Sequence, residues 1–289
     1  MKYEAIRTYC QEFSVGKMCQ ALNLTKGSYY QWLKRMKCKE DKRVKEKAII
    51  EIIAKVFEDS RKTYGYRRMK RSLLDAGVCL SEYKIRKLMQ ENGMYPVVGI
   101  KYRPARNGKR TGRFMENIVK QNFSPISLNE VWAGDITYIK TALGWVYLAV
   151  VIDLYNREVI GYSISKTIDT ELVKRALCNA LARNNKKTGG TIFHSDRGTQ
   201  YCSRGFQQML EKHGLIGSMS RPGCPYDNAC VESFFSTAKR ECISRKEYVT
   251  LNEVKADLFE YIEMFYNRKR MHKTLGYKSP IEFRLLESA

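Results

Sequence analysis

Residues 221–240 read RPGCPYDNACVESFFSTAKR, a glycine- and proline-containing turn followed by a helical pattern. Asp227 and Asn228 are good N-cap residues, so we expect the helix to begin near them. The apolar side chains on one stripe, the face that packs on a core, are Val231, Phe234, Phe235, Ala238 and Cys242. Glu232 and Lys239 share a second face, which places a carboxylate at the rim of that core. An amphipathic helix with an ordinary Glu–Lys pair at its rim explains this pattern equally well. The sequence upstream of the helix is needed to distinguish the two interpretations.

Two further acids stand in unusual places upstream of this helix. Asp135 lies inside VWAGDITYI, residues 131–139, where β-branched and aromatic residues predict a strand. Asp196 ends a second strand-like run, residues 191–196, directly before an Arg-Gly turn. A carboxylate in a half-buried strand is costly unless a cation or hydrogen bonds satisfy it. Three such carboxylates that converge would form an all-oxygen site suited to Mg²⁺ or Mn²⁺.

Three motifs, in this order along the chain, resemble the acidic triad of DDE transposases. They are Trp132-x-x-Asp135-Ile-Thr-Tyr, His194-Ser-Asp196-Arg-Gly-Thr-Gln-Tyr and Gly223-x-Pro-x-Asp-Asn-Ala-x-x-Glu232-Ser-Phe-Phe. The chain resembles the orfB-type transposases of bacterial insertion sequences. It resembles retroviral integrases more distantly, and those share the thirty-five-residue gap between the second Asp and the Glu. A further motif, Asn267-x-x-Arg270-x-His272-x-x-Leu-Gly-Tyr277-x-Ser-Pro280, is similar to the end of the same core.

The resemblance implies a DNA transposase that cleaves and joins strands at insertion-sequence ends. Asp135, Asp196 and Glu232 would be its catalytic residues and the ligands of two Mg²⁺ ions, or of Mn²⁺, when DNA is bound. Lys239 matches the basic residue that these families place seven positions after the Glu, and with Arg240 it is expected to contact DNA. The implied partners are double-stranded DNA with the element's terminal inverted repeats, target DNA, further copies of this chain in a homo-oligomer, and the product of a preceding reading frame.

The charge of the chain points independently to an anionic partner. The formal net charge is +22, and its distribution is uneven. Residues 1–125 hold 29 Lys and Arg against 12 Asp and Glu, whereas residues 126–289 hold 23 against 18. Most of the excess therefore lies outside the expected catalytic core, where a separate DNA-binding region would carry it.

Several other classes of protein do not fit the sequence. The longest apolar run, residues 145–152, is far shorter than the ~20 residues of a membrane span, and the N-terminus lacks the apolar core of a signal peptide. The nine Cys include no C-x-x-C pair, which favours reduced thiols in a cytoplasm. The resemblance implies that this cytoplasm is bacterial and that the protein acts at the nucleoid. No His precedes His194, so a His/Cys zinc module ahead of the core is excluded.

The N-terminal region, residues 1–44, has the pattern of a helix-turn-helix. Residues 14–23 and 28–35 are expected to form two helices around a turn at 24–27, with the second helix as the candidate reader of a DNA groove. The expected polar contacts to DNA are Lys26, Ser28, Tyr29, Gln31 and Lys34. A plain helical hairpin remains a rival interpretation.

Residues 45–96 are expected to form a second helical DNA-binding domain, which resembles the helix-turn-helix-like region that precedes the core in the same transposases. Its expected helices cover residues 45–57, a segment from Tyr64 to about Ala76, and a segment from an N-cap at Ser81 to Gly93. Its candidate phosphate contacts are Arg67, Arg68, Lys70 and Arg71. The alternative interpretation is that these side chains only face water. Residues 97–124 contain Gly, Pro and Asn with little periodicity, and we expect a basic linker there.

Residues 125–289 predict an α/β catalytic core with a mixed sheet, for which the resemblance implies a ribonuclease-H-like fold and a C-terminal helix. Strands are expected at about 131–140, 145–153 and 158–165, at a run ending at Asp196, and at 215–219. Helices are expected at about 169–183 and 204–213, at the Glu232 segment, and after a capping box formed by Thr250 and Glu253.

Four other polar residues have either a functional or an ordinary structural interpretation. Asp153, at a strand end, is better explained as a turn residue than as a fourth ligand, and capping suffices for Asp227. His194 either positions water or DNA or is a satisfied core-edge residue. His272 stands among Arg and Lys and is a candidate phosphate contact.

Two alternatives to a transposase stay open on the sequence alone. One is a ribonuclease-H-like nuclease that never joins strands, and the long basic N-terminal half weighs against it. The other is a non-enzymatic, sequence-specific DNA-binding regulator with a decayed core, and the intact acidic triad weighs against it.

Overall fold

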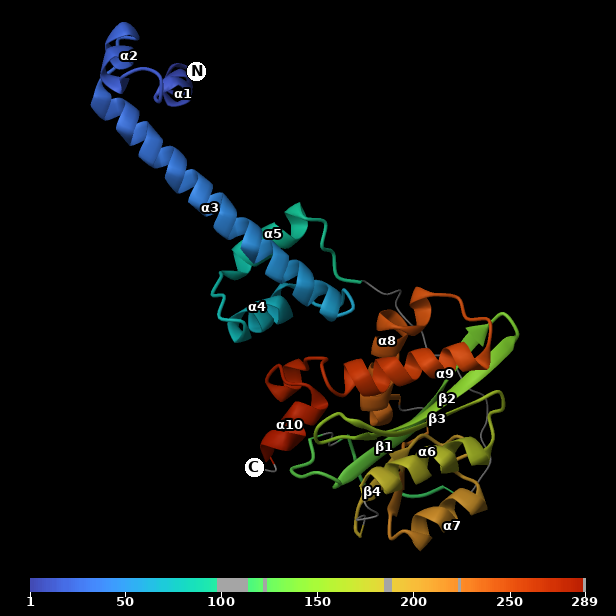
Figure 1. Ribbon diagram of the computed structural model, residues 1–289. Coiled ribbons are helices and arrows are strands. Elements are labelled where there is room, and N and C mark those ends of the chain that lie inside the picture. Colours follow the sequence, from blue (N-terminus) through green and yellow to red (C-terminus); the bar gives the residue numbers. More distant parts are fainter. Residues whose placement is uncertain (98–113, 122–123, 185–188, 223–224, 288–289) are drawn as a thin grey trace. The chain divides into compact units, whose positions relative to one another are not determined.

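The computed structural model in Figure 1 describes residues 1–97, 114–121, 124–184, 189–222 and 225–287. The chain divides into two compact units. The first comprises Met1–Asp59 and Met69–Met94, and the second comprises Ser60–Arg68 and Tyr95–Ala289. No helix in these described ranges is long and apolar enough to cross a membrane.

The first unit is built from helices. They are α1 (Lys2–Tyr9), α2 (Val15–Ala21), α3 (Lys26–Asp59), α4 (Tyr66–Asp75) and α5 (Glu82–Glu91). Ser14 caps α2 by accepting a hydrogen bond from Lys17 N, and Ser81 caps α5 by accepting one from Lys84 N. Both caps place a hydroxyl where the first turn of a helix leaves its N–H groups without partners.

Helix α3 differs from the expectation of two separate helices. It runs unbroken for 34 residues, because no Gly or Pro follows Gly27 within it. The expected boundary between regions 1–44 and 45–96 therefore falls inside a continuous helix. The N-terminal end of α3 packs through Tyr29 against Ile6 and Cys19, and its C-terminal end buries Ile53 and Phe57.

The second unit is organised around a five-stranded mixed sheet. Its strands are β1 (Val131–Thr141), β2 (Gly144–Asp153), β3 (Val159–Ser165), β4 (Ile192–Ser195) and β5 (Ile216–Met219), in the order β3-β2-β1-β4-β5. The first three strands pair antiparallel, while β4 lies parallel to both β1 and β5. This is the arrangement expected for a ribonuclease-H-like core, and the predicted strand positions are confirmed to within a few residues.

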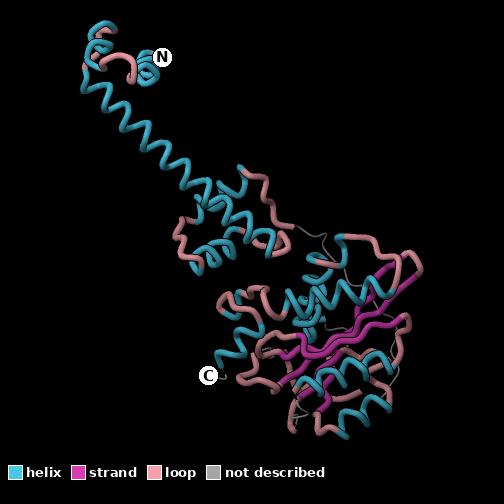
Figure 2. Tube along the Cα trace, in the orientation of Figure 1, coloured by secondary structure: helices cyan, strands magenta, loops and turns pink. Residues whose placement is uncertain are grey.

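Helices cover both faces of the sheet, as Figures 1 and 2 show. One face carries α6 (Thr170–Arg183) and α7 (Arg204–Lys212), and the other carries α8 (Ala229–Glu241) and α9 (Leu251–Phe259). Gly161 of β3 allows α6 to approach closely, because an added Cβ would lie 2.3 Å from the Ala176 carbonyl oxygen. The two apolar faces of the sheet thus build two separate cores.

Part of the expected linker belongs to this core, which corrects the prediction for residues 97–124. Residues 98–113 and 122–123 of that segment lie outside the described residues, but residues 114–121 lie against β5. Glu116 O accepts a hydrogen bond from Met219 N at 3.2 Å, and Val119 is buried. Backbone pairing and apolar burial, which composition alone did not reveal, hold this segment in place.

Residues 60–68 also belong to the second unit, although they interrupt the first in sequence. The Tyr64 hydroxyl donates a hydrogen bond at 2.8 Å to Lys269 O, a residue 205 positions away. Arg61 forms an ion pair of 2.8 Å with Glu260. A short early segment is thereby fixed to the C-terminal part of the unit.

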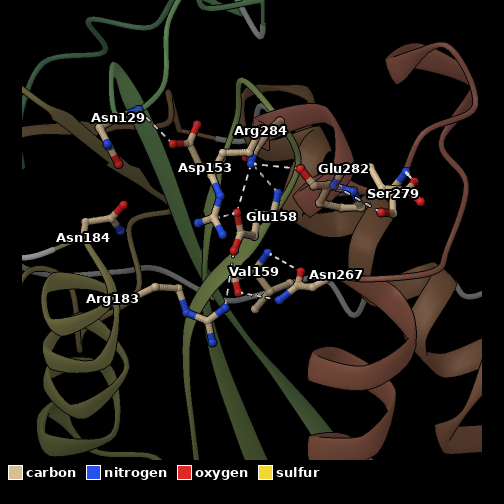
Figure 3. Close-up of polar contacts among 12 residues, drawn as sticks. Asn129, Asp153, Glu158, Val159, Arg183, Asn184, Asn267, Ser279, Glu282 and Arg284 are labelled. Carbon is tan, nitrogen blue, oxygen red and sulfur yellow. Dashed lines mark hydrogen bonds and ion pairs between the residues drawn. The ribbon is translucent and has the colours of Figure 1, made fainter. Parts of the chain in front are cut away.

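The C-terminal part continues α9 through a π-helical stretch, Glu260–Tyr266, and ends in α10 (Pro280–Glu287). The predicted capping box is present at the start of α9, because Thr250 Oγ1 accepts from Glu253 N while Glu253 accepts from Val249 N. Asn267 follows the π-helical stretch, and its side-chain amide bonds both the N–H and the C=O of Val159 at 3.0 Å (Figure 3). The motif at 267–280 is therefore structural at this position.

A buried ion pair joins α8 to this C-terminal part. Arg270 contacts Glu241 through two hydrogen bonds, of 2.7 and 2.8 Å, and the Tyr261 hydroxyl donates to the same carboxylate at 3.0 Å. The Arg270 and Glu241 side chains are only 6% and 3% exposed, so neither charge has water to replace its partner.

The turn between β2 and β3 holds two buried carboxylates, shown in Figure 3. Glu158 pairs with Arg183 at 3.4 Å and with Arg284 of α10 at 3.2 Å. Asp153 accepts hydrogen bonds from the backbone N–H groups of Asn129 and Tyr155, which supports the expected turn role. Burial is the main reason that the pKa of Asp153 rises to about 6.

We expect Arg270→Ala to lower the free energy of unfolding by about 3–5 kcal/mol, because it removes the buried cation of Glu241 and leaves only the exposed Arg240, 3.9 Å away. Denaturant unfolding followed by circular dichroism measures this. Lys174→Ala, which breaks an exposed pair with Glu171 in the same unit, is the control and should cost less than about 1 kcal/mol. Equal costs for the two variants would contradict the assignment of a buried pair.

We expect Asp153→Asn to change how stability depends on pH. Between about 4 and 6 the folded carboxyl holds a proton that the unfolded chain has released, so Asp153 lowers stability as pH rises through this window. The variant should therefore gain up to roughly 3 kcal/mol relative to the parent between pH 4 and pH 7. Unfolding curves across this range measure the difference.

Asp169→Asn is the matched control for this pH effect. Hydrogen bonding from Thr167 lowers the pKa of Asp169. The stability that the Asp169 carboxylate contributes is therefore lost only at a pH near or below the ordinary pKa of an Asp side chain. A parallel pH profile for Asp153→Asn and the parent between pH 4 and pH 7 would refute the assignment.

Candidate active site

The pairing of β1 with β4 brings the first two acids together. The register pairs Gly134 with Ser195, the last residues of this parallel contact. Asp135 and Asp196 are the next residues on these two neighbouring strands, which lie ~4.8 Å apart in any sheet. Both carboxylates also lie near the buried side chain of Tyr201. Burial is the main cause of the raised pKa of Tyr201, and the negative charges of Asp135 and Asp196 raise it further.

Helix α8 brings the third acid to the same place. Asn228 precedes the helix, and its Nδ2 donates to Gly134 O at 3.4 Å, which ties the start of α8 to β1. Glu232 lies in the first turn of α8. Its pKa is raised, first by burial and then by the negative charge of Asp196, so these two carboxylates are near neighbours.

The three carboxylates do not form a preorganised metal site. Within the described ranges, no group of three or more His, Cys, Asp or Glu is arranged to hold an ion. Asp135 Oδ1 accepts from Ile136 N at 2.7 Å and Asp196 Oδ1 accepts from Gly198 N at 2.8 Å, so each side chain is bonded to a nearby backbone amide.

Two observations nevertheless fit a divalent cation. The repulsion between Glu232 and Asp196 is the kind of interaction that a cation relieves. Next to them, Asn228 Oδ1 is the one buried side-chain polar atom, among the described residues, that has no hydrogen-bond partner. Carboxylate and amide oxygens are ligands that Mg²⁺ and Mn²⁺ prefer, and an unsatisfied buried oxygen can also accept from an ion-bound water.

Lys239 lies two turns beyond Glu232 on α8. Its ammonium is 4.7 Å from the centroid of the Tyr138 ring. Burial lowers its pKa to about 8, and the charge of Asp135 acts in the opposite direction. Lys239 is therefore a partly buried cation near Asp135, while its neighbour Arg240 lies 3.9 Å from Glu241 and is 41% exposed.

His194 and Asp227 are fixed within the fold. The two ring nitrogens of His194 lie 2.9 Å from Ser218 Oγ and 3.2 Å from Ser220 Oγ, and burial lowers its pKa, so it is a satisfied neutral core residue. Asp227 does not cap α8 as expected. Its carboxylate instead accepts from the backbone N–H of Arg221 at 2.8 Å and from side chains of residues 117–121. Asn228 occupies the N-cap position but makes no side-chain cap bond.

The predicted DNA contacts of the N-terminal region fall into two groups. Tyr29 was expected to contact DNA, but it is 3% exposed and packs against Trp32, so it is a core residue of the first unit. Ser28 donates to Thr25 O at 2.7 Å, a local bond at the start of α3. The other three candidates are exposed and remain predicted contacts: Lys26, Gln31 and Lys34.

The predicted contacts around α4 also differ in their surroundings. Arg67 is exposed, whereas Arg68 lies over the Tyr64 ring and burial lowers its pKa. Lys70 pairs with Glu82 at 3.3 Å and Arg71 pairs with Asp75 at 3.4 Å, both in largely exposed positions where salt and phosphate can compete. Their roles on DNA remain predictions.

His272 is poorly suited to an ionic contact with phosphate. Its ring packs edge-on against Tyr266 with centroids 5.0 Å apart and lies beside Arg270. Burial and the neighbouring Arg charges lower its pKa to about 2, so the ring is neutral. The sequence showed only the basic residues around it, not the aromatic packing beneath it.

Asn228 is the functional candidate that the sequence analysis missed. The pair Asp227-Asn228 before a helix indicated caps, which is the commoner use of these residues. The only signal for another role was its position four residues before Glu232, one helical turn away.

Comparisons with known proteins identify the domains and the relatives of this chain. The model of the integrase core domain matches residues 127–225, a second integrase core domain model matches residues 213–280, and a model of an HTH-like domain matches residues 44–102. Over 283 residues the chain is 38% identical to the transposase InsF for insertion sequence IS3A of Escherichia coli K12, with 98% of each chain covered.

Solved structures show partial likeness only. The simian T-cell lymphotropic virus intasome, solved with a PP2A regulatory subunit, contains a chain with a TM-score of 0.42 at 17% identity, covering 74% of this chain and 69% of that one. The HTLV-2 integrase catalytic core domain, solved in complex with magnesium, has a TM-score of 0.39 at 17% identity, covering 55% of this chain and 97% of that one. These values carry no weight for the chemistry of this chain.

Proposed function

We propose that this chain, which belongs to the IS3 family of insertion-sequence transposases, cleaves and joins DNA strands through Asp135, Asp196 and Glu232. The observation that carries this proposal is the register of β1 on β4. It sets two of the carboxylates side by side, and α8 adds the third at their edge. Polynucleotidyl transfer is the chemistry for which such a site is suited.

In this proposal the three carboxylates hold two Mg²⁺ ions, or Mn²⁺, once DNA is bound. When present, the ions lower the pKa of the attacking oxygen and stabilise the charge that develops on the leaving 3′-oxygen. The Asn228 amide fixes the start of α8, which carries Glu232, against β1. Lys239 binds a phosphate beside the reacting one.

The two steps of the reaction need no covalent protein intermediate. In the first, water attacks a phosphodiester, the bond to the 3′-oxygen breaks, and a free 3′-OH and a 5′-phosphate result. In the second, that 3′-OH attacks a phosphodiester of the target, so one strand is joined while another 3′-OH leaves. The same carboxylates serve both steps, which is why no Ser or Tyr nucleophile is required.

The proposed substrates are double-stranded DNA with the element's inverted repeats and the target DNA, in a bacterial cytoplasm. The HTH-like match at 44–102 and the excess of basic residues before residue 126 support DNA binding by the first unit. We further propose that the chain acts as a homo-oligomer on DNA, together with the product of a preceding reading frame.

We expect Asp135→Asn, Asp196→Asn and Glu232→Gln each to reduce strand cleavage and joining by at least about 10³-fold, because each removes a charge that the proposed ions need. Binding to the element ends should persist. The measurement uses linear DNA carrying the inverted repeats, with Mg²⁺ or Mn²⁺, and resolves nicked and joined products on denaturing gels.

Glu171→Gln is the matched control for these variants, since Glu171 is an exposed residue of α6 that pairs with Lys174. Full activity of any triad variant would rule out the triad. Nicks at random positions would favour a nuclease that does not join strands. Specific end binding without products, both alone and with the upstream product added, would favour a DNA-binding regulator.

A further inference from the structure

An open groove lies beside residues 138–142 of β1 and the turn after it, beginning three residues beyond Asp135. Pairing with β4 ends at Gly134, whereas pairing with β2 continues to Thr141. There the loop after α8 returns to the sheet, because Tyr248 O accepts a hydrogen bond from Ala142 N at 2.8 Å. Between these two points the strand edge and the loop enclose about 460 Å³.

The walls of this groove combine exposed aromatic rings with lysines. Tyr138 and Trp145 lie on neighbouring strands with their rings edge-to-face at 5.3 Å, and they are 39% and 50% exposed. Lys140, Lys239 and Lys246 line the same space. We call this region the aromatic–lysine groove; its acidic lining residue is Glu247.

Each lysine of the groove is held differently. Lys239 lies over Tyr138 and feels the charge of Asp135, so it belongs both to the groove and to the surroundings of the acids. Lys246 pairs with Asp257 at 2.8 Å but is half exposed. Lys140 is exposed on β1, next to the two rings.

This combination matches the chemistry of unpaired nucleic acid. Bases stack on exposed aromatic rings and phosphates pair with lysines, which is how sequence-tolerant single-strand sites are built. Inside a duplex the faces of the bases are already stacked, so an exposed Trp and Tyr find no base there. A volume of about 460 Å³ lies within the ~300–1,000 Å³ of ordinary small-ligand sites, which suits one nucleotide better than a double helix.

We propose that the aromatic–lysine groove binds an unpaired segment of the DNA strand next to the reacting phosphate, with one base stacked on Trp145. Lys140 and Lys246 pair with the phosphates on either side of that base. The inference rests on the proposed function, because the groove meets the acids at Lys239. Its role is to hold the strand apart from its complement while the phosphate lies at the three carboxylates.

Trp145 provides a direct readout of stacking, because base stacking quenches tryptophan fluorescence. The chain has three Trp. Trp132 is fully buried and Trp32 packs against Tyr3 in the first unit, which leaves Trp145 as the tryptophan of this groove. We expect oligothymidine, added to the full-length chain without metal, to quench the emission, and Trp145→Phe to abolish the quenching.

Affinities measured by fluorescence anisotropy complete the test. Trp145→Ala should weaken binding of oligothymidine roughly 10-fold or more, leave binding of a duplex unchanged, and be largely rescued in Trp145→Phe. Lys140→Ala should reduce the slope of log affinity against log salt by about 0.7. The matched controls are Leu143→Ala, at an exposed residue of the same hairpin that does not line the groove, and Lys166→Ala.

The inference is overturned if oligothymidine causes no quenching, or if the quenching survives in Trp145→Phe. It is also overturned if Trp145→Ala weakens single-strand and duplex binding equally. Because no metal and no cleavage enter these measurements, the groove can fail while the chain still joins DNA. Conversely, loss of the proposed chemistry in the cleavage assay would leave the stacking result intact.

Discussion

The short parallel contact between β1 and β4 is the constraint on which the rest of the second unit depends. Four residues of each strand pair, and the contact stops at Gly134 and Ser195. A longer contact would bury the backbone edge of β1, and a shift by one residue would turn Asp135 to the other face of the sheet. Gly134 is part of this constraint, since an added Cβ would lie 2.6 Å from the Phe193 ring. The place where the pairing ends therefore determines both where the acids meet and where the strand edge opens.

The sequence predicts the regular part of this architecture well. Strands with alternating or continuous apolar residues and helices with clear caps at Asp169, Ser203 and Thr250 appear where their patterns place them. These signals are local, so a single sequence contains them in full. The common site of the three acids was predicted from the resemblance of their motifs to those of DDE transposases, because their spacing alone did not show that they converge.

What the sequence did not reveal depends on tertiary contacts. Tyr29 has the position of a groove-reading residue on α3. Burying its aromatic ring against Ile6, however, gives a lower free energy than leaving the ring in water. Asp227 has the position of a cap, yet its carboxylate accepts from the backbone N–H of Arg221 and from the Asn117 side chain, 110 positions earlier. His272 stands among cations in sequence and against Tyr266 in space. In each case the local pattern allowed two uses of the residue, and packing in three dimensions decided between them.

The segment at residues 60–68 makes the second unit discontinuous along the chain. Helical residues 69–94 are inserted between two pieces of one folded body. During synthesis the first piece leaves the ribosome long before its partner near residue 269, so its native contacts close a loop of about two hundred residues. Such closure delays the completion of the fold. The helices of the first unit depend mainly on contacts within their own residues, so they can fold on the nascent chain before the acids are brought together.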